Sequence, residues 1–287
     1  MGSVLKIELK KAFCNKMFCL VLGIGLVIAG ISAVQNVQIY YDNLATIAEV
    51  QQNSEVLYNP QNESITLYNG CVSMDFASSM TPLFYTLMPL LVCLAYGWSY
   101  FGERKSGYVM NVMTRTHKKS QYLLAKYIAV FLSGGAVVAI PLIANFLAVA
   151  CFIPAYQPDL YYSFYYGVQM HFLRELFYAM PLLFFGYLIA VNFLFGGLFA
   201  VCSMMLTFFI KNKFSVVLLP FMCLFGVLYL QDNVCFFLSD VYIAPMDFLR
   251  GYTMQHTSGI VILIWAVLLL VFTLGTVWGK GARDDVL

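Results

Sequence analysis

The sequence has few charged residues, and this shortage excludes an ordinary soluble fold. Asp, Glu, Lys and Arg make up 10% of the 287 residues, whereas hydrophobic residues make up 61% and the mean hydropathy is +0.79. Soluble globular domains carry about 25% charged residues. We therefore predict an all-α integral membrane protein in which residues 1–287 form a single transmembrane domain.

Motifs for catalysis and nucleotide binding are also absent. No GxxxxGK[ST] sequence occurs, and the nearest approach, Gly102–Ser106, lacks the first glycine and a preceding strand. HExxH, GxSxG and nucleophile–histidine–acid patterns are missing. The three histidines, His117, His171 and His256, fall in separate predicted loops, where we expect them to be solvated. The chain is predicted not to be an enzyme and to hold no cofactor of its own.

The eight cysteines form no CxxC pair and no Cys/His cluster with metal-ligand spacing. Most lie within apolar runs, where small residues face lipid or other helices. Only Cys71 and Cys235 fall near predicted outer segments, and their spacing does not decide whether they form a disulfide. We predict no metal site.

Six apolar runs have the length of about 20 residues that a helix needs to cross a bilayer. They are Met17–Val34, Met80–Phe101, Tyr122–Ile153, Phe177–Ile210, Phe214–Leu230 and Ser258–Trp278. The third and fourth runs exceed one crossing, and each is predicted as one helix with an interfacial extension. Pro141 and Pro181 can kink these helices, and Pro181 can equally begin the fourth after a short amphipathic stretch.

Lys and Arg are distributed unequally between the two sides of such a six-helix arrangement. Of the sixteen, only Arg174 and Arg250 fall on the side away from the termini. Cytoplasmic loops are enriched in these residues, so both termini are predicted to be cytoplasmic. Residues 1–16 have the pattern of an amphipathic interfacial helix, although a plain basic anchor is the alternative. Residues 35–79 contain no Lys or Arg and form a predicted large extracytoplasmic loop.

The apolar runs also lack carboxylates, because every Asp and Glu falls in a loop or at a helix end. Ion-coupled carriers generally need ionisable groups near the bilayer midplane. Asn145 and Asn192 suit helix packing or a weakly polar pathway, and the glycine pairs Gly23/Gly25, Gly134/Gly135 and Gly196/Gly197 suit close helix packing. We expect no buried charge, and an energised transporter must then draw energy from another subunit.

A basic island, Gly102–Lys126, lies between the second and third runs and reads GERKSGYVMNVMTRTHKKSQYLLAK. Its order of E-x-x-S-G, a hydrophobic turn, T-R-T, a basic pair and Y-L-L-A-K resembles the cytoplasmic loop of type-2 ATP-binding-cassette (ABC) exporter permeases. The amphipathic start, large first outer loop and six spans resemble the same family, so the likeness covers nearly the whole chain in topology. The segment Thr114–His117 departs from it by lacking the proline that many relatives carry.

The resemblance implies that the loop of residues 102–121 forms a short coupling helix that inserts into a groove on a cytoplasmic ATPase. The residues assigned to ATPase coupling are Glu103, Arg104, Ser106, Gly107, Met113, Arg115, Lys118 and Lys119. Val109, Met110, Val112 and Met113 are expected to form an apolar docking face. Glu103 is expected to anchor the end of the second span to the N-terminal helix through Lys10 or Lys11.

The resemblance further implies a bacterial cell-membrane complex of two permeases, identical or related, with two ATPase subunits that hold ATP and Mg. Its substrate would be amphipathic: a peptide, including an antimicrobial peptide, an antibiotic or a lipid. Membrane lipids are expected partners of the basic residues, and nucleic acid is not. The alternatives are a non-transporting sensor or assembly factor that binds a peptide through its outer loop, a membrane-embedded enzyme, and basic residues that only set topology.

Overall fold

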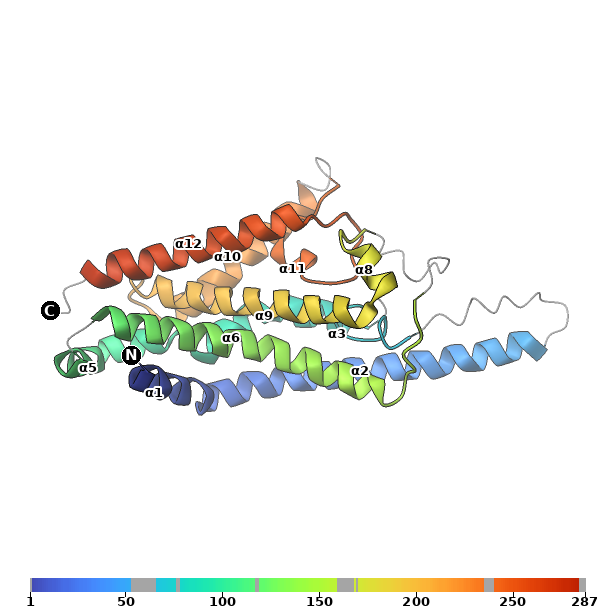
Figure 1. The fold of residues 1–287 in the computed structure, drawn as a ribbon, viewed down its shortest axis with the longest axis horizontal. Coiled ribbons are helices and arrows are strands. Elements are labelled where there is room, and N and C mark those ends of the chain that lie inside the picture. The colour runs from blue at the N-terminus through green and yellow to red at the C-terminus, as the bar shows by residue number, and fades with distance from the viewer. Residues whose placement is uncertain are drawn as a thin grey trace.

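The computed structural model describes residues 2–52, 66–75, 78–116, 119–158, 168, 170–234 and 240–283. Within these ranges every regular element is a helix, and one isolated β-bridge joins Val241 to His256. The helices lie along one another in an elongated bundle, and both chain termini lie at the same end (Figure 1). We call this the termini end and the opposite one the far end.

The helices occur in the following order and with the following bounds. They are α1 (Gly2–Phe13), α2 (Lys16–Gln52), α3 (Met80–Val92), the π-helical turn η2 (Cys93–Gly97), α4 (Ser99–Lys105), α5 (Tyr108–Thr116), α6 (Lys119–Ala150), α8 (Arg174–Ala179), α9 (Pro181–Leu206), α10 (Lys213–Asn233), α11 (Pro245–Phe248) and α12 (Gly259–Arg283). Six helical units are long and apolar enough to cross a membrane: α2, α3–η2–α4, α6, α9, α10 and α12. The prediction of an all-helical, multi-pass membrane protein is confirmed to this extent.

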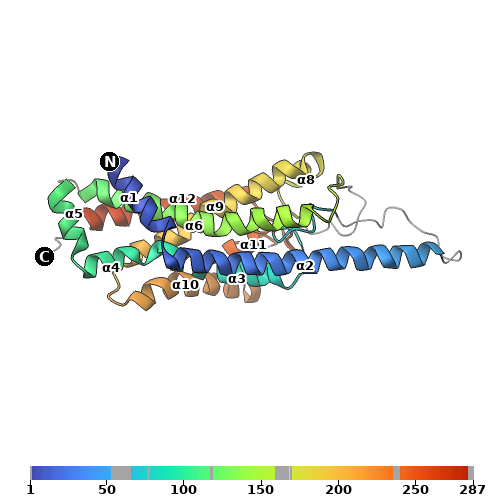
Figure 2. The ribbon, with the colours of Figure 1, turned by 90° about the horizontal axis from the view of Figure 1, so that it is seen from below.

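The first two helices are separated by a short break at Cys14 and Asn15. The Asn15 Oδ1 atom accepts a hydrogen bond from the Met17 backbone N–H at 3.1 Å, which satisfies one of the free amides at the start of α2. Helix α1 therefore leaves the line of α2 and lies at an angle to it across the termini end (Figure 2).

Helix α2 is longer than the sequence indicates. We expected it to end at Val34, but it continues to Gln52, and its outer part extends past the other helices (Figure 1). No glycine or proline interrupts residues 35–52, so nothing in the backbone ends the helix when the apolar run ends. The first part of the predicted loop 35–79 is thus a helix, and residues 53–65 lie outside the described part of the chain.

The centre of the bundle is a close contact between α6 and α9. A Cβ atom added to Gly134 would lie 2.4 Å from the Ala200 Cβ atom and 2.8 Å from the Gly196 carbonyl oxygen. A Cβ atom added to Gly196 would lie 2.8 Å from the Val138 Cγ2 atom. The predicted close packing is confirmed for Gly134 and Gly196. A Cβ atom added to Gly23 would meet nothing within 4 Å, so Gly23 does not contribute to close helix packing.

Two prolines mark irregular points in the spans. Pro181 occupies the first turn of α9 and follows the short helix α8, which confirms the second of the two readings of the fourth apolar run. Pro89 lies inside α3 and is followed by the π-helical turn Cys93–Gly97. Single π-turns are rare and are found frequently at functional sites. This one carries Tyr96, which contacts α1 and α6.

Residues 66–75 fold back against the far end of the bundle instead of extending into solvent. Asn145 of α6 holds them in place: its Oδ1 atom accepts from the Val72 N–H at 2.8 Å, and its Nδ2 atom donates to the Ala29 carbonyl at 2.7 Å. Asn145 therefore serves helix packing. Cys71 is a buried free thiol, and Cys235 lies outside the described residues.

The far end also buries one histidine that we expected to be solvated. His171 is 1% exposed and stacks on the ring of Phe172, and burial lowers its pKa to about 4. The expectation was wrong because the His171 ring packs against the rings of Phe184 and Tyr187 in α9. His256 is exposed as expected, and His117 lies outside the described residues.

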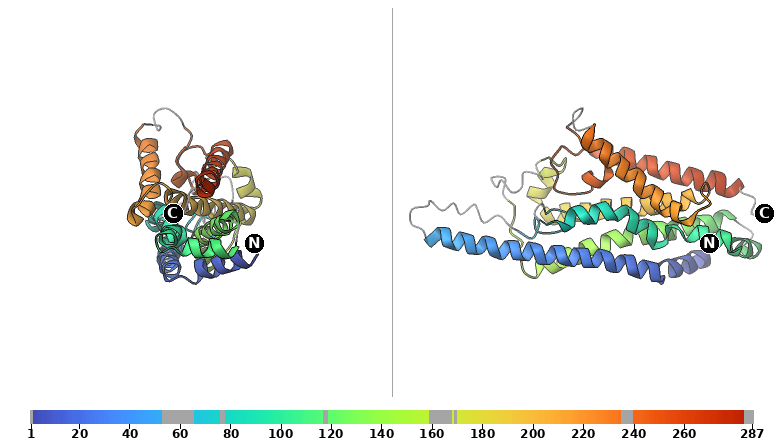
Figure 3. Two further views of the ribbon diagram at one scale, coloured as in Figure 1. Left: turned by 90° about the vertical axis from the view of Figure 1, so that its left-hand side faces the viewer. Right: turned by 180° about the vertical axis from the view of Figure 1, so that it is seen from behind.

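Viewed from the termini end, α10 and α12 lie on one side of the bundle and α1 and α2 on the other (Figure 3). The interior between them is occupied mainly by α6 and α9, which carry most of the fully buried aromatic and aliphatic side chains together with α3.

Candidate functional site

A buried ionic network joins three elements at the termini end. At its centre is Lys126 of α6, whose side chain is completely buried. The Lys126 Nζ atom lies 2.9 Å from Glu8 Oε2 in α1 and 2.8 Å from Glu103 Oε2 in α4. It also donates to the Tyr96 hydroxyl at 2.9 Å. The amphipathic helix and the facing ends of the second and third spans are thus held by one ammonium group.

The remaining polar atoms of the network are satisfied by a second lysine and by two tyrosines. Lys11 Nζ lies 3.1 Å from Glu8 Oε1 and 3.2 Å from Glu103 Oε1, and 3.9 Å from the centre of the Tyr108 ring. The Tyr96 hydroxyl donates to Glu8, and the Tyr122 hydroxyl donates to Glu103. All four carboxylate oxygens therefore accept hydrogen bonds, and the two acids are balanced by two lysines.

The balance of charge keeps Glu8 ionised although it is only 1% exposed. Burial alone would raise the pKa of Glu8, but the attraction of Lys126 and Lys11 outweighs it and the pKa is below its usual value. Burial likewise opposes the charge of Lys11, but the Tyr108 contact and the two carboxylates raise its pKa above the usual range.

The expectation that the chain buries no charge is therefore wrong at this end. Glu8 and Lys126 are both buried, and each is stable there because it is paired and fully hydrogen-bonded. One signal in the sequence points to Glu8. It lies one helical turn from Val4 and from Ala12, so it occupies the apolar face of α1, where an acid needs a partner.

The predicted coupling loop 102–121 contains the short helix α5, which lies at the extreme termini end of the bundle (Figures 1 and 2). Gly107 separates α4 from α5 with a backbone φ of 72°, a conformation that favours glycine, and its N–H donates to the Arg104 carbonyl at 3.3 Å. Glu103 contacts Lys11 of the N-terminal helix, as predicted for one of the two candidate lysines.

The other predicted coupling residues are divided between packing and solvent. Arg104 donates to the Thr207 carbonyl at 3.5 Å, and the Ser106 hydroxyl donates to the Glu103 carbonyl at 3.2 Å. Met113 and Arg115 belong to α5 and Lys119 begins α6, but their side chains, like the whole of Lys118, lie outside the described part of the structure.

The apolar docking face predicted on α5 is smaller than expected. Val109 is completely buried in the bundle core and Val112 packs partly against it, so these two side chains hold α5 in place. Met110 is 45% exposed and remains available to a partner. The expectation was wrong for Val109 because α5 lies against the bundle instead of projecting from it.

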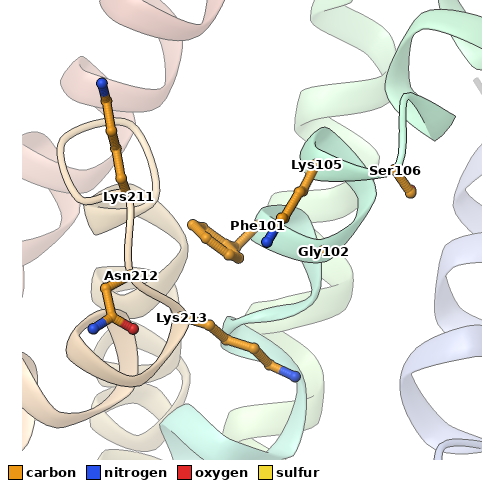
Figure 4. Close-up of a pocket in the computed structure, with 7 residues that line it drawn as sticks. All are labelled: Phe101, Gly102, Lys105, Ser106, Lys211, Asn212 and Lys213. Carbon is orange, nitrogen blue, oxygen red and sulfur yellow. The ribbon is translucent and has the colours of Figure 1, made fainter.

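Beside this segment, three lysines surround an open cavity of about 480 Å³. Lys105 lies next to Phe101 on α4, while Lys211 lies opposite in the turn between α9 and α10 and Lys213 begins α10 (Figure 4). Lys213 Nζ lies 3.5 Å from the centre of the Trp98 ring, and this contact between a cation and an aromatic ring holds the Lys213 side chain in position. No carboxylate is among the described residues that line the cavity, so it suits an anionic group.

The predicted pathway residue Asn192 lies elsewhere, in the middle of the bundle toward the far end. It is completely buried, and its Nδ2 atom donates to the Leu188 and Leu249 carbonyls at 2.9 Å each. The Leu249 bond ties α9 to the segment after α11, whereas the Asn192 Oδ1 atom is buried and has no hydrogen-bond partner among the described residues. The structure thus brings Glu103, Arg104, Ser106 and Gly107 together and separates them from both asparagines.

A family model described as "Protein of unknown function (DUF2705)" matches residues 43–285. The chain belongs to this family. The match to the DUF2705 model includes α3 to α12, and with them Glu103 and Lys126, but it does not include α1, which supplies Glu8 and Lys11. A search of curated proteins found no match.

Proposed function

We propose that this chain is the permease subunit of an ABC exporter and that it receives energy from a separate cytoplasmic ATPase at the termini end. The observation that carries this proposal is the network of Lys126. It fixes the end of α4, the start of α6 and the N-terminal helix to one another, so that a displacement of α5 is passed to two membrane spans and to α1 together.

The surface around α5 suits a soluble partner with acidic groups. Met110 provides an exposed apolar contact, and the cavity of Lys105, Lys211 and Lys213 presents positive charge beside it. Complementary charge between partners increases the rate of association and fixes orientation. The excess of Lys and Arg on this side of the sequence supports a cytoplasmic location for this surface.

The complete transporter would contain two permease chains and two ATPase subunits, which hold ATP and Mg, in a bacterial cell membrane. Its substrate would be amphipathic, such as a peptide, an antibiotic or a lipid. Exposed apolar side chains along α12, including Leu263, Val267 and Val271, provide a surface for lipid or for the second permease.

The proposal is tested by co-purification of the tagged chain with an ATPase from the cells that produce it naturally and by measurement of the ATP turnover of that ATPase. The variant Met110→Asp places a charge on the exposed side of α5 and removes no core packing. Met180→Asp is the matched control, because Met180 is 60% exposed at the far end. We expect Met110→Asp to bind the ATPase at least tenfold more weakly than the wild type and to lose the stimulation of ATP turnover, while Met180→Asp retains both.

Two results would overturn the proposal. One is that the wild-type chain neither binds an ATPase nor changes its turnover. The other is that Met110→Asp binds and stimulates the ATPase as the wild type does, because the partner would then not use α5.

A further inference from the structure

A small cavity of about 160 Å³ with charged residues in its lining lies at the far end of the bundle, remote from the ionic network. It is lined by the segment that folds back before α3, by the start of α3 and by the segment 242–254, which includes α11. Its charged lining consists of Asp75, Asp247 and Arg250, and Tyr242 and Tyr252 provide aromatic walls. No part of the proposed ATPase contact involves these residues.

Asp75 is buried at 4% exposure, yet one of its two carboxylate oxygens has no hydrogen bond within the described part of the chain. The Oδ2 atom accepts from Asn36 Nδ2 at 2.8 Å and from the Ser32 hydroxyl at 3.2 Å, both in α2. The Oδ1 atom is buried and has no hydrogen-bond partner among the described residues. Buried carboxylate oxygens in native proteins are nearly always hydrogen-bonded, so this atom indicates a missing donor.

A second carboxylate on the cavity wall also has a buried oxygen without a hydrogen-bond donor among the described residues. The Asp247 Oδ2 atom is buried and has no hydrogen-bond partner in the part of the chain that the structure describes. Arg250 lies 5.5 Å from the Tyr85 ring centre and contributes the one positive charge among the described lining residues, and its Nε atom is also buried without a hydrogen-bond partner among them. Two carboxylates and one guanidinium give the cavity a net charge of one negative unit when all are ionised.

This combination selects among possible ligands by charge and by size. A single positive charge neutralises the cavity, whereas a divalent metal would leave it positive beside Arg250. Consistent with this, the described residues contain no group of three His, Cys, Asp or Glu side chains that could hold a metal ion. The volume is below the roughly 300 Å³ of typical small-molecule sites, so only the head of a larger ligand fits.

The geometry points to a binding site for the ammonium group of a primary amine, with Asp75 Oδ1 and Asp247 Oδ2 as its acceptors. An ammonium group has three N–H donors and no acceptor, which matches two unsatisfied carboxylate oxygens. The tyrosine walls add favourable contact between a cation and aromatic rings. The alkyl part of the ligand extends outward past Met254, which is exposed at the rim.

The protonation of the two aspartates supports the same assignment. Burial raises the pKa of Asp75 and of Asp247 to about 6 in each case, with Arg250 acting to lower that of Asp247 and Asp232 to raise it. The other titratable side chains that act on this region are Tyr85, Tyr242 and Cys71, and burial raises the pKa values of Tyr242 and Cys71, so that these two are uncharged near neutral pH. The carboxylates are therefore ionised at pH 7.5 and protonated at pH 5, and amine binding should follow them.

The test uses the full chain in detergent at pH 7.5 with n-butylamine as the probe and 1-butanol as its uncharged analogue. Asp75→Asn and Asp247→Asn remove the charge of one acceptor each, and the asparagine carbonyl can still accept from Ser32 and Asn36. Asp42→Asn is the matched control, because Asp42 is exposed on α2 and the change of charge is the same.

We expect butylamine, and not butanol, to raise the thermal unfolding midpoint of the wild type and of Asp42→Asn. Each of the two cavity variants should bind butylamine at least tenfold more weakly, and the wild type should lose the response at pH 5. The inference is overturned if butylamine does not raise the unfolding midpoint of the wild type, if butanol acts as butylamine does, if either cavity variant responds like the wild type, or if Asp42→Asn loses the response equally. Because no ATPase is present, the result is independent of the proposed transport role.

Discussion

Replacement of Lys126 by methionine is the most direct test of the ionic network. Methionine is close to lysine in volume and keeps the alkyl packing of α6, so the change removes chiefly the ammonium group. Removal of one partner from a buried ion pair costs about 3–5 kcal/mol, because the opposite charge remains buried. Glu8 and Glu103 would both lose a contact below 3 Å.

Lys11 reduces this cost, because it already contacts one oxygen of each glutamate. We therefore expect a loss of about 3 kcal/mol, at the lower end of the range for buried pairs. For a chain of this size that corresponds to a fall of about 6–12 °C in the unfolding midpoint. The assay is thermal unfolding in detergent, followed by tyrosine and tryptophan fluorescence and by recovery of monodisperse protein.

A second substitution separates the loss of the ion pair from general damage. In Lys126→Met/Glu8→Gln the remaining charges, Glu103 and Lys11, balance each other. The double variant should therefore be more stable than the sum of the single changes by at least about 1 kcal/mol. Lys16→Met removes the same charge from an exposed position at the same end and is the control.

The interpretation of the network is refuted if Lys126→Met costs no more than Lys16→Met. It is refuted equally if Glu8→Gln and Lys126→Met are additive, because two groups in direct contact through 2.9 Å must influence each other.

Acid should weaken the network in a defined direction. Because the pKa of Glu8 is lowered by Lys126 and Lys11 against the effect of burial, its contribution to stability is complete above the usual carboxyl pKa and is lost as the pH falls through the lower folded value. A pH series of unfolding midpoints should show this loss in the wild type and a flatter profile in Glu8→Gln. Gly134→Ala should destabilise the bundle by about 1–3 kcal/mol through overpacking against α9. Gly226→Ala, where a Cβ atom meets nothing within 4 Å, should be neutral or stabilising, and equal effects of the two changes on the unfolding midpoint would contradict the close contact.

Features that depend on local sequence could be predicted. The six spans follow from the length of apolar runs, and the start of α9 at Pro181 follows from the missing N–H of proline. The contact of Glu103 with α1 was also within reach, because a helix end needs counter-charges and Lys11 was one of two candidates.

Features that depend on distant pairing could not be predicted in the same way. Glu8 and Lys126 are 118 positions apart, and Lys126 has the appearance of one more basic residue that sets topology. Asp75 lies in a segment whose sequence resembles a solvated loop. It is buried because the hydrogen bond from the Val72 N–H to Asn145 keeps this segment against the bundle. The end of α2 at Gln52 was missed because a polar helix outside the membrane has no hydropathy signal.

Because α2 is long, a change in its tilt at one end displaces its other end by many ångströms. Its 37 residues form one continuous helix, about 55 Å long at 1.5 Å per residue, against a bilayer core of about 30 Å. A tilt of about 10° at the membrane end of such a rod moves its tip by about 10 Å. A change of about 10° in the tilt of α2 where it meets α1 therefore displaces the far end of α2 by about the diameter of a helix.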